Sequence, residues 1–480
     1  MDSRRAFICA EHGLAIVYYL QSEVIPTLLK DGIQVTLLTD DSLRQKIEQR
    51  FGQPGLTVEG MRLSLVRKQA SRWSELQWWL AFLRRVGGSH RMNTEAMDSY
   101  IDQVTVEESN RRRILLPFAK MFIALLRRSR AARRSLVQAQ RLFTPELYAD
   151  LFEASPPQLV VSSTPGWRMD RYLLREAHAR KVATAATVIG WDNPSSYSLP
   201  GAPVDDIVCW SDIQRQELVD GSDWDAAHVH VTGMPTYDGY FSRRWQMSRE
   251  DYFALHRLDQ RRKLICFACS FVSFSPNLQV VEALARLVRE DRLGYPSQLL
   301  VRLHPNHFLD VHLFVQEREQ IHALAAANPH VRVVAPVPLG GSLGHYSGED
   351  MPEKASMLAQ ADVFVTVYST MVVEAAIHDR PIVSACLDAP LGWDTPRKYS
   401  LPLSAIGGWP THDRFRRAEA GKVVYTETEL EAAIRRYLDH PELDAQQRRT
   451  FIERELTTID GSAGRRTGEE LIRLVDRIRR

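Results

Sequence analysis

Short apolar runs alternate with longer stretches of helical spacing along most of the chain. Residues 6–10 form an apolar run, residues 14–32 repeat apolar positions every three or four residues, and residues 33–41 form a second, β-branched run. Apolar runs of this length predict buried strands, and spacings of three and four predict helices. Strands separated by helices are typical of a parallel sheet with crossover helices, so the pattern predicts an α/β fold.

This alternation continues over two long stretches. A strand predicted to start at residue 229 ends at Gly233 and Pro235, and five consecutive strand–helix steps then follow between residues 263 and 388. The chain is also too long for one core, since single cores stop growing at roughly 250–300 residues. We therefore predict two domains and a C-terminal tail of helices that we expect to pack back on the first domain. Their boundaries are 1–236, 237–445 and 446–480.

The composition excludes several classes of protein. With 44% hydrophobic and 25% charged residues, the chain is neither disordered, collagen-like nor a disulfide scaffold. A formal charge of +2 gives no reason to expect a nucleic-acid partner. The five cysteines lie in apolar runs without framework spacing, which is typical of a reducing compartment, and the sequence displays neither a signal peptide nor a membrane-spanning run. We therefore expect a cytoplasmic protein that touches a membrane only peripherally.

The loop after the strand predicted at 362–368 carries the most informative pattern. The run ends at Tyr368, Ser369 and Thr370 follow, and a helix begins at once with Glu374 one turn inside it. The free N–H groups of a helix start and two hydroxyls suit a phosphate, and a carboxylate can accept both hydroxyls of a ribose. The pattern predicts that these four residues bind a nucleoside diphosphate. A plain helix cap is the alternative.

A second polar loop follows the strand predicted at 298–303. Arg302 and His304 lie at the carboxyl end of this strand, and Asn306 adds a polar group. A guanidinium matches the geometry of phosphate, and an imidazole donates or carries a proton. We expect this strand to neighbour the strand that leads to Ser369, so that both loops form one donor site. Solvated residues at the rim of a sheet are the alternative.

The loop after the first strand carries a candidate catalytic base. Glu11, His12 and Gly13 separate the strand from the helix that follows. Either the carboxylate or the imidazole could take a proton from an acceptor hydroxyl, and glycine permits close approach of the backbone. We predict Glu11 and His12 as catalytic candidates and Gly13 as part of the acceptor site, with a packing role for His12 as the alternative.

Another strand-end loop, at residues 190–197, combines an aromatic and two polar groups. Trp191 offers a ring face for a sugar, and Asp192 and Asn193 suit sugar hydroxyls. We predict Trp191 and Asn193 as sugar-binding residues and Asp192 as a further candidate base. An Asp-Asn-Pro turn without a ligand would have the same sequence.

The segment 109–136 carries nine Arg or Lys residues and no acid around a core of Ile, Leu, Phe and Met. A basic, apolar helix of this kind can lie on an anionic bilayer surface. The tryptophan-rich segment 73–85 could add aromatic anchors to the same surface. A helix that packs on the core and turns a basic face to water is the alternative.

Two other patterns lead to no site. Cys266 and Cys269 form a C-x-x-C within a strand, without a second pair or a nearby histidine, so no metal site is predicted. Neither a P-loop nor a G-x-G-x-x-G motif follows the first strand. Their absence disfavours a P-loop NTPase and a dinucleotide oxidoreductase.

These residues resemble those of the GT-B glycosyltransferases, and the resemblance covers most of the chain. Residues 369–383 are similar to the donor-site signature of that superfamily, in which hydroxyls at a helix start hold the diphosphate and a glutamate binds ribose. The resemblance implies these roles for Ser369, Thr370 and Glu374. It also implies two Rossmann-like, doubly wound parallel-sheet domains that face a central cleft.

Within that superfamily, the pairing of residues 302–305 with 367–370 is similar to bacterial teichoic-acid and capsule enzymes, including CDP-glycerol glycerophosphotransferases. Residues 190–197, 209–218 and 231–241 look like surface-polysaccharide glycosyltransferases near that branch.

Two positions depart from these patterns. Val367 stands where the glycerophosphotransferase pattern has Asp, which argues against a glycerol-phosphate donor. Thr366 stands where the retaining pattern has a first glutamate, which favours an inverting mechanism.

We therefore expect a glycosyltransferase that moves a sugar from a nucleotide sugar, with UDP as the expected nucleotide, to a hydroxyl of a surface glycan or lipid-linked acceptor. The expected step is a metal-independent, inverting displacement that needs no cofactor besides the nucleotide-sugar substrate. The alternatives are a UDP-GlcNAc 2-epimerase-like enzyme, a CDP-glycerol-type polymer transferase and a non-catalytic nucleotide-sugar-binding protein.

Overall fold

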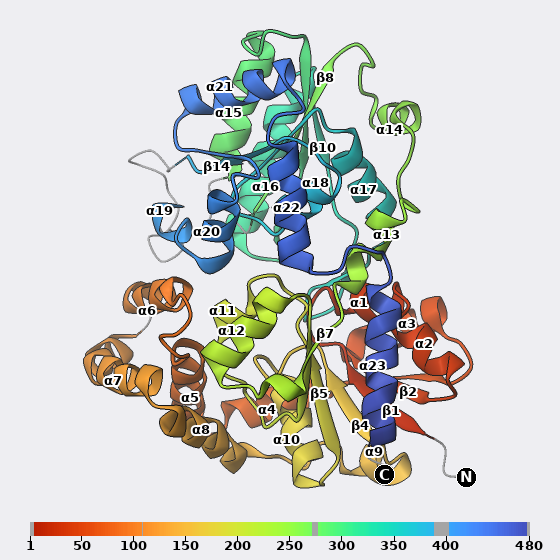
Figure 1. The fold of residues 1–480 in the computed structure, drawn as a ribbon, viewed down its shortest axis with the longest axis vertical. Helices are drawn as coiled ribbons and strands as arrows, with labels where there is room; N and C mark the ends of the chain where they lie inside the picture. The colour runs from red at the N-terminus through yellow and green to blue at the C-terminus, as the bar shows by residue number, and fades with distance from the viewer. Residues whose placement is uncertain (1–3, 108, 271–276, 388–402, 478–480) are drawn as a thin grey trace. The chain divides into compact units, whose positions relative to one another are not determined.

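The structure is a computed structural model that describes residues 4–107, 109–270, 277–387 and 403–477. The chain divides into two compact units, each built around its own sheet (Figure 1). The first passage between the units falls between Asp238 and Gly239. Unit 1 consists of Met1–Asp238, Leu339–Tyr346 and Leu456–Arg480, and unit 2 of Gly239–Pro338 and Ser347–Glu455.

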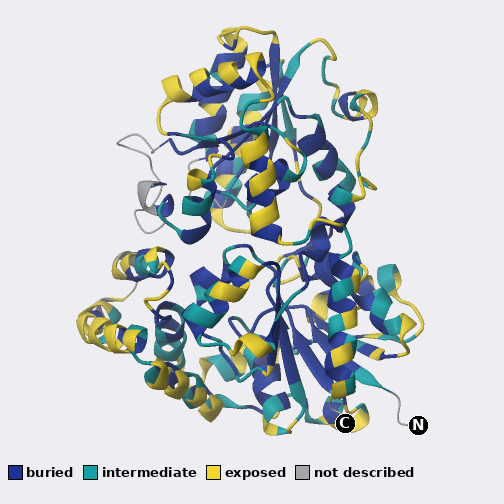
Figure 2. Ribbon diagram, viewed as in Figure 1, coloured by how far each residue is buried: buried dark blue, intermediate teal, exposed yellow. Residues whose placement is uncertain are grey.

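Unit 1 has a seven-stranded parallel sheet in the order β3-β2-β1-β4-β5-β6-β7. Its central strands are buried apolar runs, dark blue in Figure 2, as expected where helices cover both faces of a parallel sheet. The strand order reverses between β1 and β4, which makes this the switch point of the sheet. The strands are β1 (Arg5–Cys9), β2 (Gln34–Thr39), β3 (Leu56–Gly60), β4 (Leu159–Ser162), β5 (Ala183–Thr187), β6 (Asp206–Cys209) and β7 (Val229–Val231).

A helical insertion between β3 and β4 enlarges unit 1. Its helices α5, α6 and α7 pack around an apolar cluster that contains Phe82, Met97 and Ile123. The helices of unit 1 are α1 (Ala15–Leu20), α2 (Val24–Lys30), α3 (Arg44–Phe51), α4 (Leu63–Ser71), α5 (Ser74–Val86), α6 (Glu95–Glu107), α7 (Asn110–Arg128), α8 (Arg130–Ala139), α9 (Ala149–Ala154), α10 (Arg171–Ala179), α11 (Asn193–Tyr197), α12 (Asp212–Ser222) and α23 (Ala463–Arg477).

A small ribbon from the C-terminal half of the sequence packs on unit 1. It consists of β11 (Pro338–Gly340) and β12 (His345–Tyr346). The Tyr346 N–H donates to the Gly13 carbonyl at 2.8 Å, and a Cβ at Gly13 would lie 3.1 Å from the Gly344 carbonyl oxygen. The close approach that Gly13 permits is therefore made by the protein's own backbone, whereas the sequence suggested a ligand.

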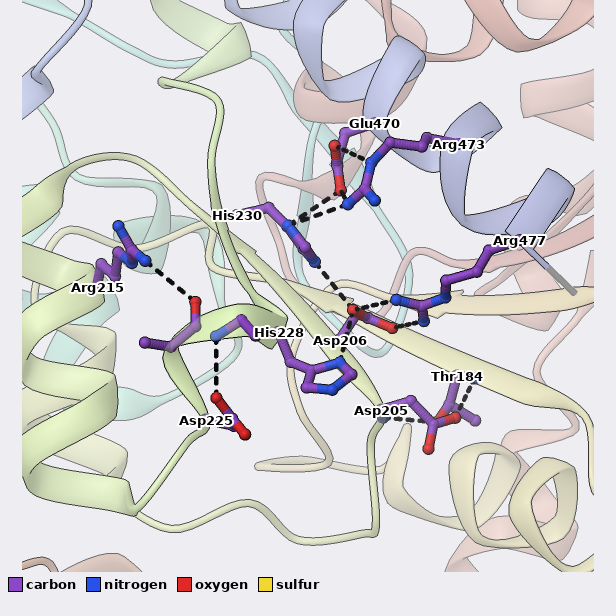
Figure 3. A network of polar contacts seen from close by, with 12 residues as sticks. Thr184, Asp205, Asp206, Arg215, Asp225, His228, His230, Glu470, Arg473 and Arg477 are labelled. Atoms are coloured by element: carbon purple, nitrogen blue, oxygen red, sulfur yellow. Dashed lines mark hydrogen bonds and ion pairs between the residues drawn. The ribbon is translucent and has the colours of Figure 1, made fainter.

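The last helix, α23, packs along α2 and is tied to the start of β6. Gly468 makes the packing possible, since a Cβ there would lie 2.6 Å from Thr27 Cβ. On the polar side, the Asp206 carboxylate lies 2.9 Å from His230 Nε2, 3.0 Å from His228 Nδ1 and 3.2 Å from Arg477 Nη1 (Figure 3). Burial raises the pKa of Asp206, but the hydrogen bonds from these three side chains outweigh burial and hold the pKa well below its usual range.

Unit 2 has a six-stranded parallel sheet in the order β10-β9-β8-β13-β14-β15. The order reverses between β8 and β13, so this sheet too has a switch point. Because β8 lies between β9 and β13, the expectation that the loops of Arg302 and Ser369 follow adjacent strands was wrong. The strands are β8 (Lys263–Ala268), β9 (Ser297–Arg302), β10 (Val331–Val334), β13 (Val363–Thr366), β14 (Ile382–Ala385) and β15 (Lys422–Val424).

Helices of unit 2 bury their apolar faces against the strands, with α15 and α21 contributing much of the core. The helices are α13 (Asp238–Phe241), α14 (Arg249–His256), α15 (Asn277–Arg289), α16 (His312–Ala326), α17 (Met351–Gln360), α18 (Met371–Ile377), α19 (Leu403–Ile406), α20 (Pro410–Arg417), α21 (Glu427–Asp439) and α22 (Ala445–Leu456).

Replacement of Asp206 should loosen α23. We expect Asp206→Asn to lower the free energy of unfolding by about 3 kcal/mol. This value is at the low end of the loss expected when one partner of a buried ion pair is removed, because Arg477 is half exposed. The folded-state pKa of Asp206 is lowered, so its contribution is complete above the ordinary value of 3.8 and is lost as the pH falls.

Urea unfolding followed by circular dichroism measures this loss, and the difference from wild type should narrow below about pH 4. Asp31→Asn, which breaks a more exposed ion pair with Arg4, is the control and should cost less than about 1 kcal/mol. Equal stability of Asp206→Asn and wild type at pH 7 would contradict the role given to this carboxylate.

Candidate functional site

Polar groups gather at the carboxyl ends of β1 and β4, the switch point of the unit 1 sheet. Open α/β sheets bind ligands at such points, because the loops leave in opposite directions and open a crevice. The Ser163 hydroxyl, directly after β4, accepts the N–H groups of Glu11 and His12, each at 3.0 Å. Two predicted site residues thus lie at the switch point and are fixed to the loop after β4.

Glu11 is a buried acid, and one of its carboxyl oxygens accepts no hydrogen bond. The residue is 4% exposed, and its Oε2 accepts no hydrogen bond from the residues that the structure describes. Arg168 Nε lies 3.9 Å from this oxygen. Burial, followed by the nearby Asp170 carboxylate, raises the pKa of Glu11 to about 8. A carboxyl with a pKa raised into this range can exchange a proton near the working pH of most enzymes.

Asp170, which sequence reasoning missed, is the second buried acid of the pair. Its Oδ2 accepts hydrogen bonds from Ser162 Oγ at 2.5 Å and Thr164 Oγ1 at 2.6 Å, and its Oδ1 accepts one from the Arg168 N–H at 3.2 Å. Burial raises the pKa of Asp170, while these donors favour its charged form. Because Asp170 is satisfied and Glu11 is not, Glu11 is the member of the pair that is available for chemistry.

His12 is suited to donate a hydrogen bond. Its Nδ1 accepts the Leu14 N–H at 3.2 Å, so the proton of the neutral ring lies on Nε2. Desolvation, followed by the charges of Arg168 and His345, lowers the pKa of His12 to about 3. A ring that is neutral and protonated on Nε2 does not take a further proton there. Of the two candidates after β1, the geometry favours Glu11 as the base.

The β11–β12 ribbon adds two polar groups to the same edge of the sheet. His345 is buried beside Thr39, with 3.4 Å between Nε2 and Oγ1, and burial lowers its pKa to about 4. Asp40, directly after β2, accepts a hydrogen bond from Ser342 Oγ at 2.9 Å. Some 300 residues separate these partners in the sequence, and no local pattern indicates their contact.

The loop after β5 holds its polar groups for its own structure. Trp191 is 1% exposed, so its ring packs in the core and offers no face to a sugar. Asn193 Oδ1 accepts the Gly190 N–H at 2.8 Å, and Asp192 Oδ2 accepts the Ser196 hydroxyl at 2.8 Å. The structure therefore does not bring these three predicted residues together as a sugar site.

In unit 2 the switch point lies between β8 and β13, and the predicted Ser369 loop follows β13. Tyr368 has a φ of +36°, a strained backbone conformation for a bulky residue. Ser369 Oγ accepts the Met371 N–H at 3.3 Å, whereas the Thr370 side chain makes no capping hydrogen bond. Backbone strain of this kind concentrates at ligand sites.

Glu374 has two partners that sequence reasoning missed. The side chain is buried and accepts the Tyr240 hydroxyl at 2.6 Å, and Lys354 Nζ lies 2.7 Å from its Oε2. Lys354 comes from α17, which is separated from Glu374 in the sequence by a whole strand. The carboxylate that resembles a ribose ligand is therefore part of an ion pair.

Arg302 anchors α17 and is turned away from solvent. It is 4% exposed, and its guanidinium binds the carboxylates of Asp350 and Glu353 at the start of that helix. Two carboxylates neutralise its charge, so the structure does not support the phosphate contact that the sequence suggested. Arg302 instead helps to hold the helix that carries Lys354.

His304 lies closer to the ion pair of Lys354 and Glu374 than the strand order suggests. Desolvation lowers the pKa of His304 to about 3, and the charge of Lys354 is among the further causes. His304 Nδ1 accepts the Asn306 N–H at 3.1 Å, which fixes the ring. The structure thus brings His304 into the electrostatic neighbourhood of Lys354, while Asn306 shapes the loop.

Among the residues that the structure describes, no three His, Cys, Asp or Glu side chains are placed to hold a metal ion together.

Comparison with solved structures gives likenesses over the full chain. A UDP-GlcNAc 2-epimerase from Neisseria meningitidis bound to UDP-GlcNAc is 10% identical, with 99% of this chain and 100% of that chain covered and a TM-score of 0.52. A glycosyltransferase from Rickettsia africae ESF-5 is 10% identical, with 100% of both chains covered and a TM-score of 0.51. The calicheamicin glycosyltransferase CalG4 is 12% identical, with 99% of both chains covered and a TM-score of 0.50.

The sequence matches no protein-family model and no curated protein. Identities this low carry information on the fold alone. The likenesses nevertheless extend over both units, each of which has a doubly wound parallel sheet. The chain therefore has the GT-B fold of two Rossmann-like domains, as the resemblance in its sequence implied.

Proposed function

We propose that the protein transfers a sugar from a nucleoside diphosphate sugar to an acceptor hydroxyl, with Glu11 as the catalytic base. The observation that carries this proposal is the Glu11 carboxyl at the switch point of unit 1. Its Oε2 accepts no hydrogen bond from the described residues, and a pKa of about 8 suits a general base. The Asp192 carboxylate already accepts a hydrogen bond from the Ser196 hydroxyl. His12 Nδ1 accepts the Leu14 N–H, and its Nε2 carries the proton, so both residues are weaker candidates for the base.

The proposed step is one displacement. Ionised Glu11 takes the proton of the acceptor hydroxyl while the acceptor oxygen forms a bond to C1 of the sugar. The bond from C1 to the diphosphate oxygen breaks, and the nucleoside diphosphate leaves with that electron pair. Attack from the face opposite the leaving group inverts the configuration at C1.

For the donor, we propose that Ser369 and Thr370 hold the diphosphate and that Glu374 binds the ribose. The uncapped Thr370 hydroxyl and the strained Tyr368 support a ligand at this loop. A carboxylate can accept several hydrogen bonds, so ribose can share Glu374 with Tyr240. Lys354 then supplies a positive charge for the phosphates. UDP is the proposed nucleotide, and a surface glycan or a lipid-linked sugar is the proposed acceptor.

A 2-epimerase is the second candidate, because the epimerase bound to UDP-GlcNAc has a similar fold over its whole length. A buried acid such as Glu11 can also move a proton without an acceptor. The two functions differ in their products. An epimerase that is incubated with UDP-GlcNAc alone changes the configuration at C2 of the sugar. A transferase without an acceptor instead hydrolyses UDP-GlcNAc slowly and releases a sugar with unaltered C2.

The pH dependence of turnover tests the role of Glu11. The base has to be ionised, so kcat/KM for release of the nucleoside diphosphate should rise with pH and level off above about 8. Glu11→Gln should lower kcat by about 10²- to 10⁴-fold. Release of UDP from a UDP-sugar into water provides the assay, since water can replace the acceptor.

Glu176→Gln is the matched control, because Glu176 is a buried acid of unit 1 that is bonded to the Tyr148 N–H. This variant should retain its activity. A rising limb near pH 3 would assign the base to His12, and unchanged turnover in Glu11→Gln would overturn the proposal.

Nucleotide binding tests the donor site. A donor at a hundredfold excess over its Kd should stabilise the wild type by about 2.7 kcal/mol. Glu374→Gln removes the charge but keeps the size of the side chain, and we expect it to weaken binding by about 1–3 kcal/mol. Thermal unfolding with UDP-, GDP-, CDP- and CMP-linked sugars measures both effects and identifies the nucleotide.

Glu455→Gln is the control for Glu374→Gln, because Glu455 is also buried and pairs with an arginine, Arg414 at 2.8 Å. It should lower the stability of the free protein without changing the shift that a nucleotide causes. Absence of stabilisation by every nucleotide, or equal affinity in Glu374→Gln and wild type, would contradict the donor site.

A further inference from the structure

Helix α7 exposes apolar side chains along its whole length. Ile114, Phe118 and Met121 are 71%, 70% and 73% exposed, and Phe122 and Leu125 continue the row. Spacings of three and four residues place these five residues, the α7 stripe, on one face of the helix. Figure 2 shows the exposed character of α7, which lies at the edge of unit 1 in Figure 1.

The fold uses the opposite face of the same helix. Leu116 and Ile123 are buried in the cluster formed with α5 and α6, and Leu126 is buried in a second cluster with Leu136. Packing within unit 1 therefore does not need the α7 stripe. A contiguous exposed apolar surface on a soluble unit marks an interaction site.

Basic residues accompany the α7 stripe. Lys120 and Arg128 of α7 and Arg134 of α8 are exposed, and no acidic residue occurs between positions 109 and 136. The exposed basic side chains of α7 and α8 therefore match an anionic partner.

Three further arginines of this segment serve the fold. Arg112 pairs with Glu75 at 2.8 Å, and Arg127 pairs with Asp98 at 2.8 Å. Arg133 is buried and binds the carboxylate of Asp223 at 2.6 Å. The basic segment thus divides into arginines that hold the helices together and basic residues that face outwards.

One aromatic residue lies near the start of the stripe. Trp73, directly before α5, is 76% exposed, and the ion pair of Glu75 with Arg112 joins the start of α5 to the start of α7. Trp78 and Trp79, by contrast, pack against the helical cluster. Only Trp73 of these three is placed to act as an interfacial anchor.

We propose that α7 docks unit 1 on the surface of an anionic lipid bilayer. The α7 stripe enters the boundary between headgroups and acyl chains, and Lys120, Arg128 and Arg134 meet the anionic headgroups. An apolar row on one exposed helix fits a flat surface. Charged residues stand beside this row, whereas the cores of protein–protein interfaces are depleted of charged residues, so the surface suits a bilayer better than a protein partner. None of the described helices is long and apolar enough to cross a membrane. The docking does not depend on the proposed sugar transfer.

Vesicle flotation tests the proposal. The wild type should float with vesicles of phosphatidylcholine mixed with phosphatidylglycerol, and less with phosphatidylcholine alone or at high salt. Replacement of Phe118, Met121 and Leu125 by Ser should lower the bound fraction at least about tenfold, as should Lys120→Glu, Arg128→Glu and Arg134→Glu together. Circular dichroism and thermal unfolding establish that both variants are folded.

The matched control removes exposed apolar residues elsewhere. Leu142→Ser and Leu255→Ser change side chains that are 82% and 55% exposed, and flotation should be unaffected. Equal flotation of the wild type and the stripe variant would overturn the proposal. Nucleotide-induced stabilisation is measured in parallel and should be the same in all variants, so failure of docking is distinguishable from failure of the donor site.

A labelling experiment tests the proposal without removing the stripe. All five native cysteines are buried, so Met121→Cys can be labelled selectively with an environment-sensitive fluorophore. Its emission should shift to the blue with anionic vesicles, and that of labelled Leu142→Cys should not. An unshifted emission would show that the stripe stays in water and would contradict the proposal. A dimer in light scattering that is lost only in the stripe variant would assign the stripe to a second copy of the chain and would also contradict it.

Discussion

Burial of two carboxyl groups at one switch point is the constraint on which the candidate site depends. Glu11 and Asp170 follow neighbouring strands of unit 1, and desolvation opposes ionisation of both. Three hydrogen bonds stabilise the charged form of Asp170, whereas Glu11 Oε2 accepts none from the described residues, so burial raises the pKa of Glu11. Ser163 fixes the two loops to each other, and the Tyr346 N–H of the β11–β12 ribbon donates to the Gly13 carbonyl in the loop of Glu11. The local fold therefore sets the chemistry of Glu11.

Basic side chains lie close to the candidate site of unit 2. Two basic groups near the carboxyl ends of the unit 2 strands, Arg302 and Lys354, are neutralised within the protein. Arg302 binds two carboxylates of α17, and Lys354 of the same helix binds Glu374. A donor diphosphate would compete with Glu374 for Lys354, and a ribose would compete with Lys354 for Glu374. At the proposed donor site, a nucleotide that carries both groups would replace this ion pair with two new contacts.

Most strands of the two sheets could be predicted, because buried parallel strands consist of uninterrupted apolar runs. β3, from Leu56 to Gly60, was missed because this edge strand is mostly half-buried and mixes polar with apolar residues. β15 is only three residues long, and the ribbon strands are as short or shorter. The ends of predicted strands singled out the loops of Glu11 and Ser369, whereas the order of the strands in each sheet, and with it the switch points, did not follow from the sequence.

Partners could not be predicted, because sequence spacing does not tell which distant side chain a group meets. Arg302 looked like a phosphate ligand, and its two carboxylates lie some 50 residues further on. Trp191 looked like a sugar platform, but burial of the loop after β5 takes its ring into the core. For α7 the basic residues were visible in the sequence, whereas the division into paired and outward-facing side chains needed the packing of α5, α6 and α8.

The protonation state of Glu11 tests the account most directly. Infrared difference spectroscopy of the wild type and Glu11→Gln isolates the carbonyl band of a protonated Glu11 side chain. The account predicts that this band is present at pH 7 and disappears as the pH rises through about 8. Absence of the band at pH 7, or its loss near the ordinary pKa of 4.5, would show that Glu11 is ionised in the folded protein and would contradict the central claim.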